Sequence, residues 1–195
     1  MKFFSNNTKY ITHYLEGLIS TVKDLSLKEI NETIQLLVKL KRRRGRLFIL
    51  GIGGSAANSS HAVNDFRKIC KIEAYTPSDN ISELTARTND DGWESVFINW
   101  LKVSNLTKKD TVMVFSVGGG DSKKNISVNL IYALRYAKKV GANIIGIVSK
   151  DGGFTKKVAN ITIMISVKSI KTTTAYAESL QAIILHTIVN HPSLT

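Results

Sequence analysis

Short apolar runs separated by helical stretches constrain the fold of this chain more than any other feature. The runs cover residues 47–50, 111–115, 143–148 and 161–165, and a weaker one covers 72–75. They are rich in β-branched residues and nearly free of charge, which is typical of strands buried on both faces of a sheet. The clearest helical stretch between them has one apolar stripe, closed by Gly141; the stripe consists of Ile126, Leu130, Ala133, Leu134 and Ala137. Because strands and helices alternate, the pattern predicts an α/β fold, a doubly wound parallel sheet with right-handed crossovers.

Two amphipathic helices precede the first of these runs. Apolar residues from Ile11 to Val22 fall on one helical stripe. Ser26, followed three residues later by Glu29, is typical of a capping box that opens a second helix. Gly45 stands where a C-terminal cap would end that helix. The pair lies outside any crossover, so the sequence predicts an appended helical hairpin.

This arrangement predicts a single domain over residues 1–195, because a chain of 195 residues suits one hydrophobic core. Within it we expect an α/β core over 46–190 and an N-terminal helix pair over 8–45. The helix pair has little core of its own, and the final helix is apolar nearly all round. Both features predict packing against other subunits in a symmetric oligomer, with a tetramer as the expected assembly.

Composition restricts where the protein works. No stretch of eighteen apolar residues is present, so no membrane span is predicted. The single cysteine, Cys70, cannot form a disulfide framework, and the first residues lack the apolar run of a signal peptide. We therefore expect a cytoplasmic location.

The net charge of +12 permits nucleic-acid binding, because clustered cations release counterions from phosphates. The dense cluster, 39–44, lies where a helix is expected to end, however, and cations there interact favourably with the helix dipole. The other lysines are scattered, with no aromatic residues between them. The pattern favours a solvated surface that attracts anionic metabolites, and nucleic acid is the weaker alternative.

Two glycine-rich segments directly follow predicted strands: the first glycine loop, 51–55, and the second glycine loop, 116–122. Ligands of parallel sheets bind where strands end and helices begin, and glycines let the backbone approach an anion closely. Ala56 breaks the dinucleotide fingerprint, so no nucleotide cofactor is expected. A valine at Gly119 should block the anion while leaving the fold intact. The residues expected to bind phosphate are Gly53, Gly54, Ser55, Ser116, Gly118, Gly119 and Ser122.

Two helices each offer a histidine and a carboxylate. His61 and Asp65 are four residues apart and share a helix face, and Glu178 and His186 lie eight apart on the final helix. Taken singly, such a histidine is more often structural, and Glu178 could be a surface ion-pair residue. Taken together, the four side chains predict a set of nitrogen and oxygen ligands for zinc. We expect them to converge at the carboxyl edge of the sheet, beside both glycine loops.

In chain order, these motifs are similar to those of one family. The matching segments are the first glycine loop with His61 and Asp65, Asn89–Gly92, Lys150–Gly153, and Glu178 with His186. They resemble the SIS (sugar isomerase) class, and within it the phosphoheptose isomerases, whose motifs are Gly-Asn-Gly-Gly-Ser, Asn-Asp-x-Gly and Lys-Asp-Gly-Gly. The resemblance extends over nearly the whole chain.

The resemblance implies a flavodoxin-like three-layer fold and an aldose–ketose isomerase of heptose biosynthesis. The implied reaction converts sedoheptulose 7-phosphate to D-glycero-D-manno-heptose 7-phosphate through an enediol(ate). Asp65 and His186 would be the bases, and Glu178 could share or take over that role. Asp90 and Ser55 would orient the substrate's hydroxyls and phosphate. The family also implies a homotetramer with active sites between subunits.

Several residues depart from the family pattern. Val117, Gly118 and Asp121 stand where the second loop usually carries hydroxyls, and Ile52 stands where the first carries Asn. Asp65 replaces Glu, and Glu178 replaces Gln. These changes indicate a divergent subgroup, for which a non-catalytic regulator or assembly protein that binds a sugar phosphate is the alternative. Retention of two histidines and two carboxylates favours the enzyme.

Overall fold

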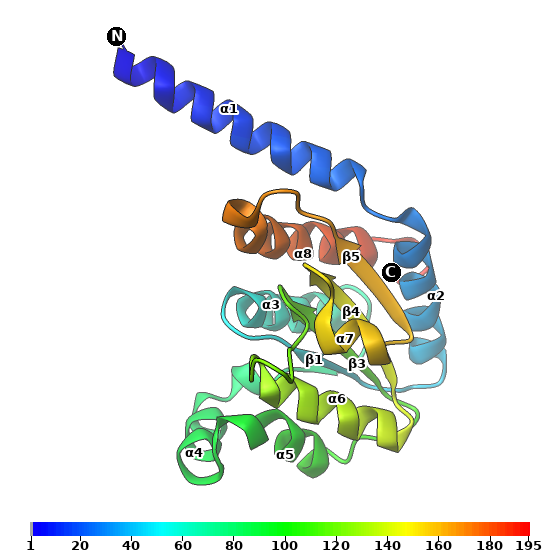
Figure 1. The fold of residues 1–195 in the computed structure, drawn as a ribbon. Helices are drawn as coiled ribbons and strands as arrows, with labels where there is room; N and C mark the ends of the chain where they lie inside the picture. Colours follow the sequence, from blue (N-terminus) through cyan, green and yellow to red (C-terminus); the bar gives the residue numbers. More distant parts are fainter. Residues whose placement is uncertain (1) are drawn as a thin grey trace.

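The computed structural model describes the backbone of residues 2–195 and the side chains from residue 8 onward. A five-stranded sheet forms its middle layer, with strand order β2-β1-β3-β4-β5 and every pairing parallel (Figure 1). This confirms the predicted doubly wound parallel sheet. The strands are β1 Leu47–Leu50, β2 Ala74–Tyr75, β3 Thr111–Ser116, β4 Asn143–Ser149 and β5 Ile161–Ile165.

Helices cover both faces of this sheet. One hydrophobic cluster joins the sheet to α2, α3 and α8, and a second joins it to α5 and α6. The helices are α1 Lys2–Lys23, α2 Leu27–Arg42, α3 Gly54–Lys68, α4 Ile81–Asp91, α5 Val96–Val103, α6 Val128–Val140, α7 Gly153–Val158 and α8 Thr173–Val189.

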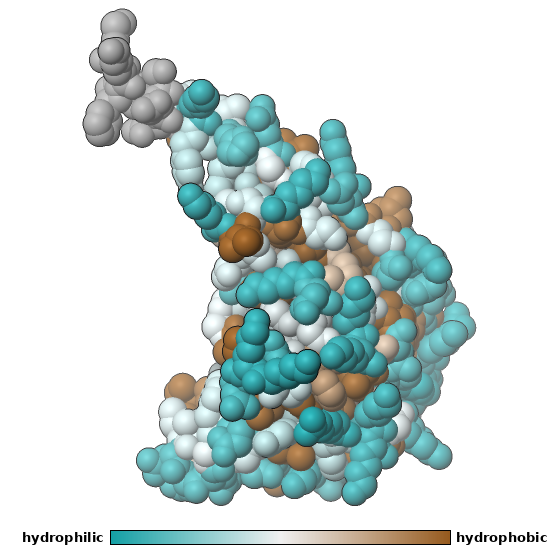
Figure 2. Space-filling view, in the orientation of Figure 1, coloured by the Kyte–Doolittle hydropathy of each residue, from teal (hydrophilic) through white to brown (hydrophobic). Residues whose placement is uncertain are grey.

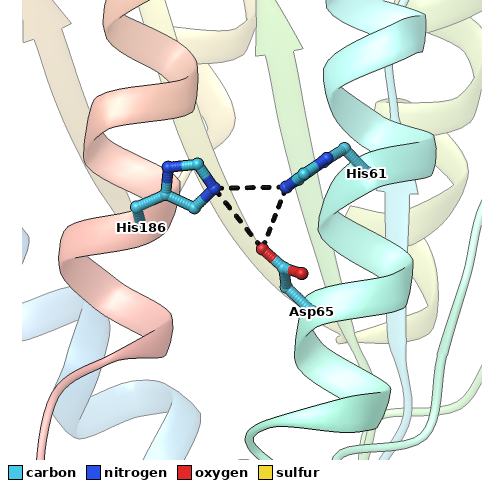
Figure 3. Close-up of side chains that lie close together, drawn as sticks. All are labelled: His61, Asp65 and His186. Carbon is cyan, nitrogen blue, oxygen red and sulfur yellow. Dashed lines mark hydrogen bonds and ion pairs between the residues drawn. The ribbon is translucent and has the colours of Figure 1, made fainter.

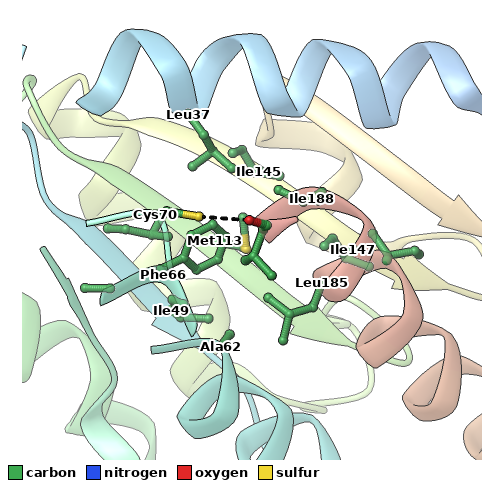
Figure 4. Packing of buried hydrophobic residues seen from close by; sticks show 14 of the residues in the cluster. Leu37, Ile49, Ala62, Phe66, Cys70, Met113, Ile145, Ile147, Leu185 and Ile188 are labelled. Carbon is green, nitrogen blue, oxygen red and sulfur yellow. Dashed lines mark hydrogen bonds between the residues drawn. The ribbon is translucent and has the colours of Figure 1, made fainter. Parts of the chain in front are cut away.

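Alternation along the strands supplies both clusters. In β1, Leu47 and Ile49 belong to the cluster under α3 and α8, while Phe48 and Leu50 belong to the cluster under α5 and α6. All four side chains are buried, as the apolar run predicted. Figure 4 shows the first cluster, where the Cys70 thiol donates a hydrogen bond to the Val189 carbonyl.

The two N-terminal helices differ in their relation to the core. Ile30, Ile34, Leu37 and Leu40 of α2 are buried in the first cluster, so α2 is part of the core and not an appended helix. The first part of α1 instead extends away from the body (Figure 1), while its second part contacts α8, where the Tyr176 hydroxyl donates a hydrogen bond to the Tyr14 carbonyl. None of the helices in the described part of the chain is long and apolar enough to span a membrane.

The start of α2 agrees with the sequence prediction but lacks the expected capping hydrogen bond, and the start of α6 lies later than predicted. Ser26 is the N-cap residue of α2, but its side chain makes no capping hydrogen bond. The stripe that predicted α6 included Ile126, whereas α6 begins at Val128 and Ile126 is exposed. Ile126 instead pairs with Asp121 in an isolated antiparallel bridge, which closes the second glycine loop on itself before the helix begins.

An ion pair anchors the amino edge of the sheet. The guanidinium of Arg46 lies 2.9 Å from Oδ2 of Asp110, directly before β1 and β3 respectively. Burial favours a higher pKa for the Asp110 carboxyl, but hydrogen bonds from Arg46 and Thr107 outweigh it, so the pKa lies below its ordinary value. This edge therefore holds the strand starts, and the opposite edge carries the glycine loops.

Candidate functional site

Three of the residues singled out from the sequence meet between α3 and α8. His61 and Asp65 come from α3 and His186 comes from α8 (Figure 3). The two Nε2 atoms lie 3.1 Å apart, and Asp65 Oδ2 lies 3.1 Å from His61 Nε2 and 3.6 Å from His186 Nε2. We call this group the His–Asp cluster.

Local geometry explains how the cluster forms. His61 and Asp65 are one helical turn apart and therefore project from the same face of α3. Asp65 is buried, and its other oxygen, Oδ1, accepts a hydrogen bond from the Asn64 side chain. The histidine side chains are about half exposed, at 54% for His61 and 52% for His186. The cluster is thus an acidic group beneath two imidazoles that small molecules can reach.

The donor set fits a zinc ion. Ligand atoms about 2.1 Å from a tetrahedral ion lie about 3.4 Å from one another, and the three separations here are 3.1, 3.1 and 3.6 Å. All three ligand atoms lie within 4.8 Å of one another. Three protein ligands leave a fourth position open, which is the arrangement of catalytic zinc sites.

Glu178, the fourth expected ligand, does not join this cluster. Glu178 and His186 are eight residues apart on α8, which separates them by about 12 Å along the helix axis. The Glu178 carboxylate lies against Gly54, at the start of α3, with Oε1 2.7 Å from where a Cβ of residue 54 would stand. The two helices therefore run in the same direction, and each turn of α8 meets a different turn of α3.

This arrangement also corrects the expected location of the cluster. We predicted all four side chains at the carboxyl edge of the sheet, beside both glycine loops. His61 lies seven residues beyond Gly54, so the cluster is about 10 Å further along α3 than the loop. Glu178 stays at the loop, and the histidines lie two turns away along the groove between the helices.

The first glycine loop leads directly into α3. Gly53 precedes the helix with a φ of 63°, in the left-handed region that glycine adopts without strain, and a Cβ there would meet no atom within 4 Å. Ser55 is buried in the first turn, and its carbonyl accepts a hydrogen bond from the Ser59 hydroxyl. This loop is open on the Gly53 side and covered by Glu178 on the Gly54 side.

The second glycine loop is held from behind by the start of α7. The backbone N–H and the hydroxyl of Thr155 both donate to the Gly119 carbonyl at 2.8 Å, and the Phe154 N–H donates to the Gly120 carbonyl. Ser116 Oγ accepts a hydrogen bond from the Gly119 N–H. A Cβ on Gly119 would overlap the Gly152 carbonyl, so a valine there would disturb the fold, contrary to the sequence prediction.

The remainder of this loop forms a separate turn. Asp121 Oδ1 accepts hydrogen bonds from the N–H groups of Lys124 and Lys123, which lower the pKa of its carboxyl. Ser122 lines a cavity of about 450 Å³ together with Lys156 and Lys157 of α7. Asp121 therefore replaces a family hydroxyl with a group engaged in its own turn.

Two further residues of the family motifs lie outside the His–Asp cluster. Asp90 lies exposed in the last turn of α4, where its Oδ1 accepts a hydrogen bond from the Asn89 side chain. Lys150 follows β4, and its Cδ lies 4.0 Å from where a Cβ of Gly118 would stand. The sequence marked Lys150 as part of a family motif but gave it no role, because its neighbour in space is 32 positions away in the chain.

Comparison with known proteins decides the family. Residues 9–149 match the family model of the SIS domain. The chain belongs to the SIS-domain family. The expected resemblance is confirmed, and the doubly wound sheet is the fold of that family.

Relatives of this SIS domain include enzymes of sugar-phosphate metabolism. The phosphoheptose isomerase of Helicobacter pylori (strain P12) is 30% identical over 146 residues, covering 72% of this chain and 72% of that protein. Lincomycin biosynthesis protein LmbN of Streptomyces lincolnensis is 29% identical and the match covers 85% of this chain. The match covers 62% of LmbN, less than two thirds of its length.

Solved structures show the same fold. A phosphoheptose isomerase from Francisella tularensis superposes with a TM-score of 0.79 at 18% identity, covering 97% of both chains. The sugar isomerase domain of an RpiR transcription factor from Sphaerobacter thermophilus superposes with a TM-score of 0.62 at 14% identity. The SIS fold therefore occurs in an isomerase and in a transcription factor, and the chemistry must be argued from the site.

Proposed function

We propose that this SIS domain is an aldose–ketose isomerase that converts sedoheptulose 7-phosphate to D-glycero-D-manno-heptose 7-phosphate through an enediol(ate). The observation that carries the proposal is the His–Asp cluster, which places a buried carboxylate 3.1 and 3.6 Å from two half-exposed imidazoles. A module that only binds sugar phosphates has no need for proton carriers in such close contact. The phosphoheptose isomerase relatives support the same reaction class.

The spacing between the loops and the cluster suits this substrate. The cluster lies about 10 Å along α3 from the first glycine loop. An extended chain of seven carbons with bonds of about 1.5 Å spans about 8 Å, and the phosphate ester adds to this length. A heptose phosphate can therefore hold its phosphate at the glycine loops while its carbonyl end reaches the histidines.

Isomerisation moves one proton between adjacent carbons. It also requires protons to be added to and removed from the oxygens bound to those carbons. Asp65 is suited to move the carbon-bound proton, because its carboxylate is buried and oriented by Asn64. His186 is suited to serve the oxygens, because its half-exposed ring contacts both His61 and Asp65. Glu178 lies too far along α8 to act at the same carbon atoms, so we assign it no proton transfer.

His61, Asp65 and His186 are also the residues that would hold zinc. When bound, such an ion would stabilise the negative charge of the enediolate. Activity that rises with added zinc and falls with a chelator would identify the cluster as a metal site. Activity that is unaffected by the chelator would identify Asp65 and His186 as the bases of a metal-free enzyme.

Assembly is part of this proposal. Apolar side chains on α1 are exposed along one stripe, and Figure 2 shows apolar atoms at the surface near this helix. The stripe consists of Ile11, Leu15, Ile19 and Val22. We expect the α1 stripe to pack against other copies in a homotetramer, with the half-exposed histidines completing sites between subunits. A monomer at micromolar concentration in light scattering would contradict this assembly.

The direct test is turnover. Purified protein is incubated with ketose 7-, 6- and 5-phosphates, and NMR follows the aldose. We expect turnover of the 7-phosphate and a loss of about a hundredfold or more in His186→Ala and in Asp65→Asn, as for the loss of a general base. His13→Ala, a histidine on α1 outside the cluster, is the matched control. Sugar phosphate that binds without turnover would contradict the enzyme and favour the regulator.

A further inference from the structure

The net charge of the protein gathers at the amino edge of the sheet, opposite the glycine loops. Four segments lead into strands β2, β1, β3 and β4 there, and together they carry fourteen Lys or Arg residues and two acidic residues. Their net charge therefore equals the +12 of the whole chain, and the remaining residues carry equal numbers of cations and carboxylates. We call these segments, which are 67–73, 39–46, 102–110 and 138–142, the basic end.

The fold brings the four segments of the basic end side by side, although they are far apart in the sequence. Main-chain hydrogen bonds join each segment to the next in the order of the strands. The N–H groups of Leu47, Thr111 and Asn143 donate to the carbonyls of Glu73, Arg46 and Asp110, at 2.8, 2.9 and 3.2 Å respectively. The helices α2 and α6 end on this side, at the right of Figure 1. Because neighbouring strands lie about 5 Å apart, the segments form one continuous surface.

Little of this charge is neutralised by carboxylates. Among the residues whose side chains the structure describes, Arg46 is the only cation of the basic end in an ion pair, with Asp110. Eight of the fourteen cations lie in the last turns of α2, α3, α5 and α6, where the helix dipole stabilises them. The dipole has less effect on the cations that lie beyond the helix ends, which are Arg43, Arg44, Lys71, Lys108 and Lys109. Like charges gathered in this way repel one another, so the surface suits a partner with many negative charges.

The structure of the basic end favours a flat anionic surface over a nucleic acid. It consists of helix ends and of turns before strands, so it offers no helix or strand to enter a groove of a duplex. The four segments contain no aromatic residue for stacking on bases, and the Arg67 guanidinium covers the ring of the neighbouring Tyr75 at 5.4 Å. Val103, next to Lys102, is 67% exposed and can enter the interfacial region of a bilayer.

We propose that the basic end docks the protein on a membrane surface rich in anionic phospholipids. The lysines and arginines then lie against the lipid phosphates, and each adds about 1 kcal/mol, or about fivefold in affinity. The glycine loops lie at the opposite edge of the sheet, so the docked protein leaves them open to ligands from solution. This inference does not rest on the isomerase proposal, because it uses none of the residues of that site.

Co-sedimentation with vesicles tests the docking. We expect the wild type to bind vesicles of phosphatidylglycerol and phosphatidylcholine in equal parts, and not vesicles of phosphatidylcholine alone. A basic-end variant that lacks four exposed lysines should bind about a hundredfold more weakly or worse. Its substitutions are Lys108→Gln, Lys109→Gln, Lys138→Gln and Lys139→Gln. A wild type that does not bind the anionic vesicles would overturn the proposal.

A control variant has the same net charge and an intact basic end. Its exposed lysines lie on α1, at the start of α2 and before α8, and its substitutions are Lys9→Gln, Lys28→Gln, Lys168→Gln and Lys171→Gln. Along α2, Lys28 is about 16 Å from Lys39, which exceeds the Debye length of about 10 Å. Vesicle affinity should therefore stay within about threefold of the wild type. Equal losses in the two variants would overturn the assignment to the basic end.

Two further measurements guard against a folding defect and a different polyanion. Arg43→Gln combined with Arg44→Gln alters another segment and should weaken vesicle binding more than about tenfold. Urea denaturation at low salt should show both basic-end variants at least as stable as the wild type, because repulsion is relieved. Fluorescence anisotropy with duplex DNA of mixed sequence supplies the comparison. At physiological ionic strength we expect vesicle binding to persist and duplex binding to be lost. The opposite order, with the same dependence on these cations, would overturn membrane docking in favour of nucleic acid.

Discussion

The two glycine loops have similar sequences and similar positions after a strand, yet their surroundings differ. The first loop runs straight into α3, and the atoms nearest to Gly54 belong to the flexible side chain of Glu178. The second is backed by rigid backbone: Gly119 lies against the Gly152 carbonyl, and α7 donates hydrogen bonds to the loop carbonyls. One loop is bounded by a movable negative charge, and the other by a fixed main chain.

The difference teaches that a glycine can be required for unrelated reasons. Gly54 leaves room for another residue's side chain, whereas Gly119 combines a φ of 68° with a backbone contact that no side chain could share. We expected both glycines to bind an anion. The contacts of Gly54 with Glu178 and of Gly119 with the Gly152 carbonyl form without one.

The largest effect should come from Gly119→Val. A β-branched residue at positive φ is strained, and its Cβ would overlap the Gly152 carbonyl, so we expect a loss of at least about 3 kcal/mol in the free energy of unfolding. Urea denaturation measures it. Gly118→Val is the matched control, because its Cβ would have Lys150 Cδ as its nearest neighbour at 4.0 Å. Equal stability of the two variants would show that the backbone contact does not constrain the loop.

A smaller effect should follow from Lys150→Gln. If the cation beside Gly118 attracts the phosphate, its removal should weaken the binding of inorganic phosphate about tenfold, or about 1.4 kcal/mol. Calorimetry at low ionic strength measures this, and the loss should shrink as salt is added. Lys171→Gln, an exposed lysine just before α8, serves as the control for net charge. Equal losses of phosphate affinity in the two variants would show that Lys150 acts only through the net charge of the protein and does not attract phosphate to the second glycine loop.

Gly54→Ala should cost less, about 1 kcal/mol of stability, because the obstacle is the movable end of a side chain. The second substitution Glu178→Ala should recover most of this loss, since it removes the atoms that a Cβ would meet. A double-mutant cycle by thermal unfolding measures the coupling between the two positions. Additive effects would mean that Glu178 does not occupy the space at Gly54.

The smallest effect concerns the ionisation of Asp121 in the second glycine loop. The N–H groups of Lys124 and Lys123 hold the pKa of Asp121 below its ordinary value of about 3.9. A lowered pKa stabilises the turn at pH values above the unfolded pKa, and this stabilisation is lost as the pH falls through the folded pKa. The amide proton shifts of Lys123 and Lys124 should therefore titrate together below pH 3.9, as NMR can follow. A midpoint at or above the ordinary value would contradict these hydrogen bonds.

Much of the fold could be predicted because it depends on local patterns. The run 47–50 alternates between two cores and became β1 with the predicted bounds. Gly141 ends α6 in the left-handed conformation, as its place after the apolar stripe indicated. The N-terminal hairpin was only partly predictable: its helices were evident, but the sequence does not show that α2 lies on β5 and α8 and enters the core.

The candidate site divides in the same way. The sequence alone determined that His61 and Asp65 share a helix face, because four residues make one turn, and that each glycine loop directly follows a strand. Only the tertiary structure decided that His186 joins them, that Glu178 meets Gly54, and that Lys150 lies beside Gly118. The physical reason is that helix and strand periodicity set the direction of a side chain within its own element. Which residue it meets depends on how elements far apart in the chain pack, down to the turn at which α8 contacts α3.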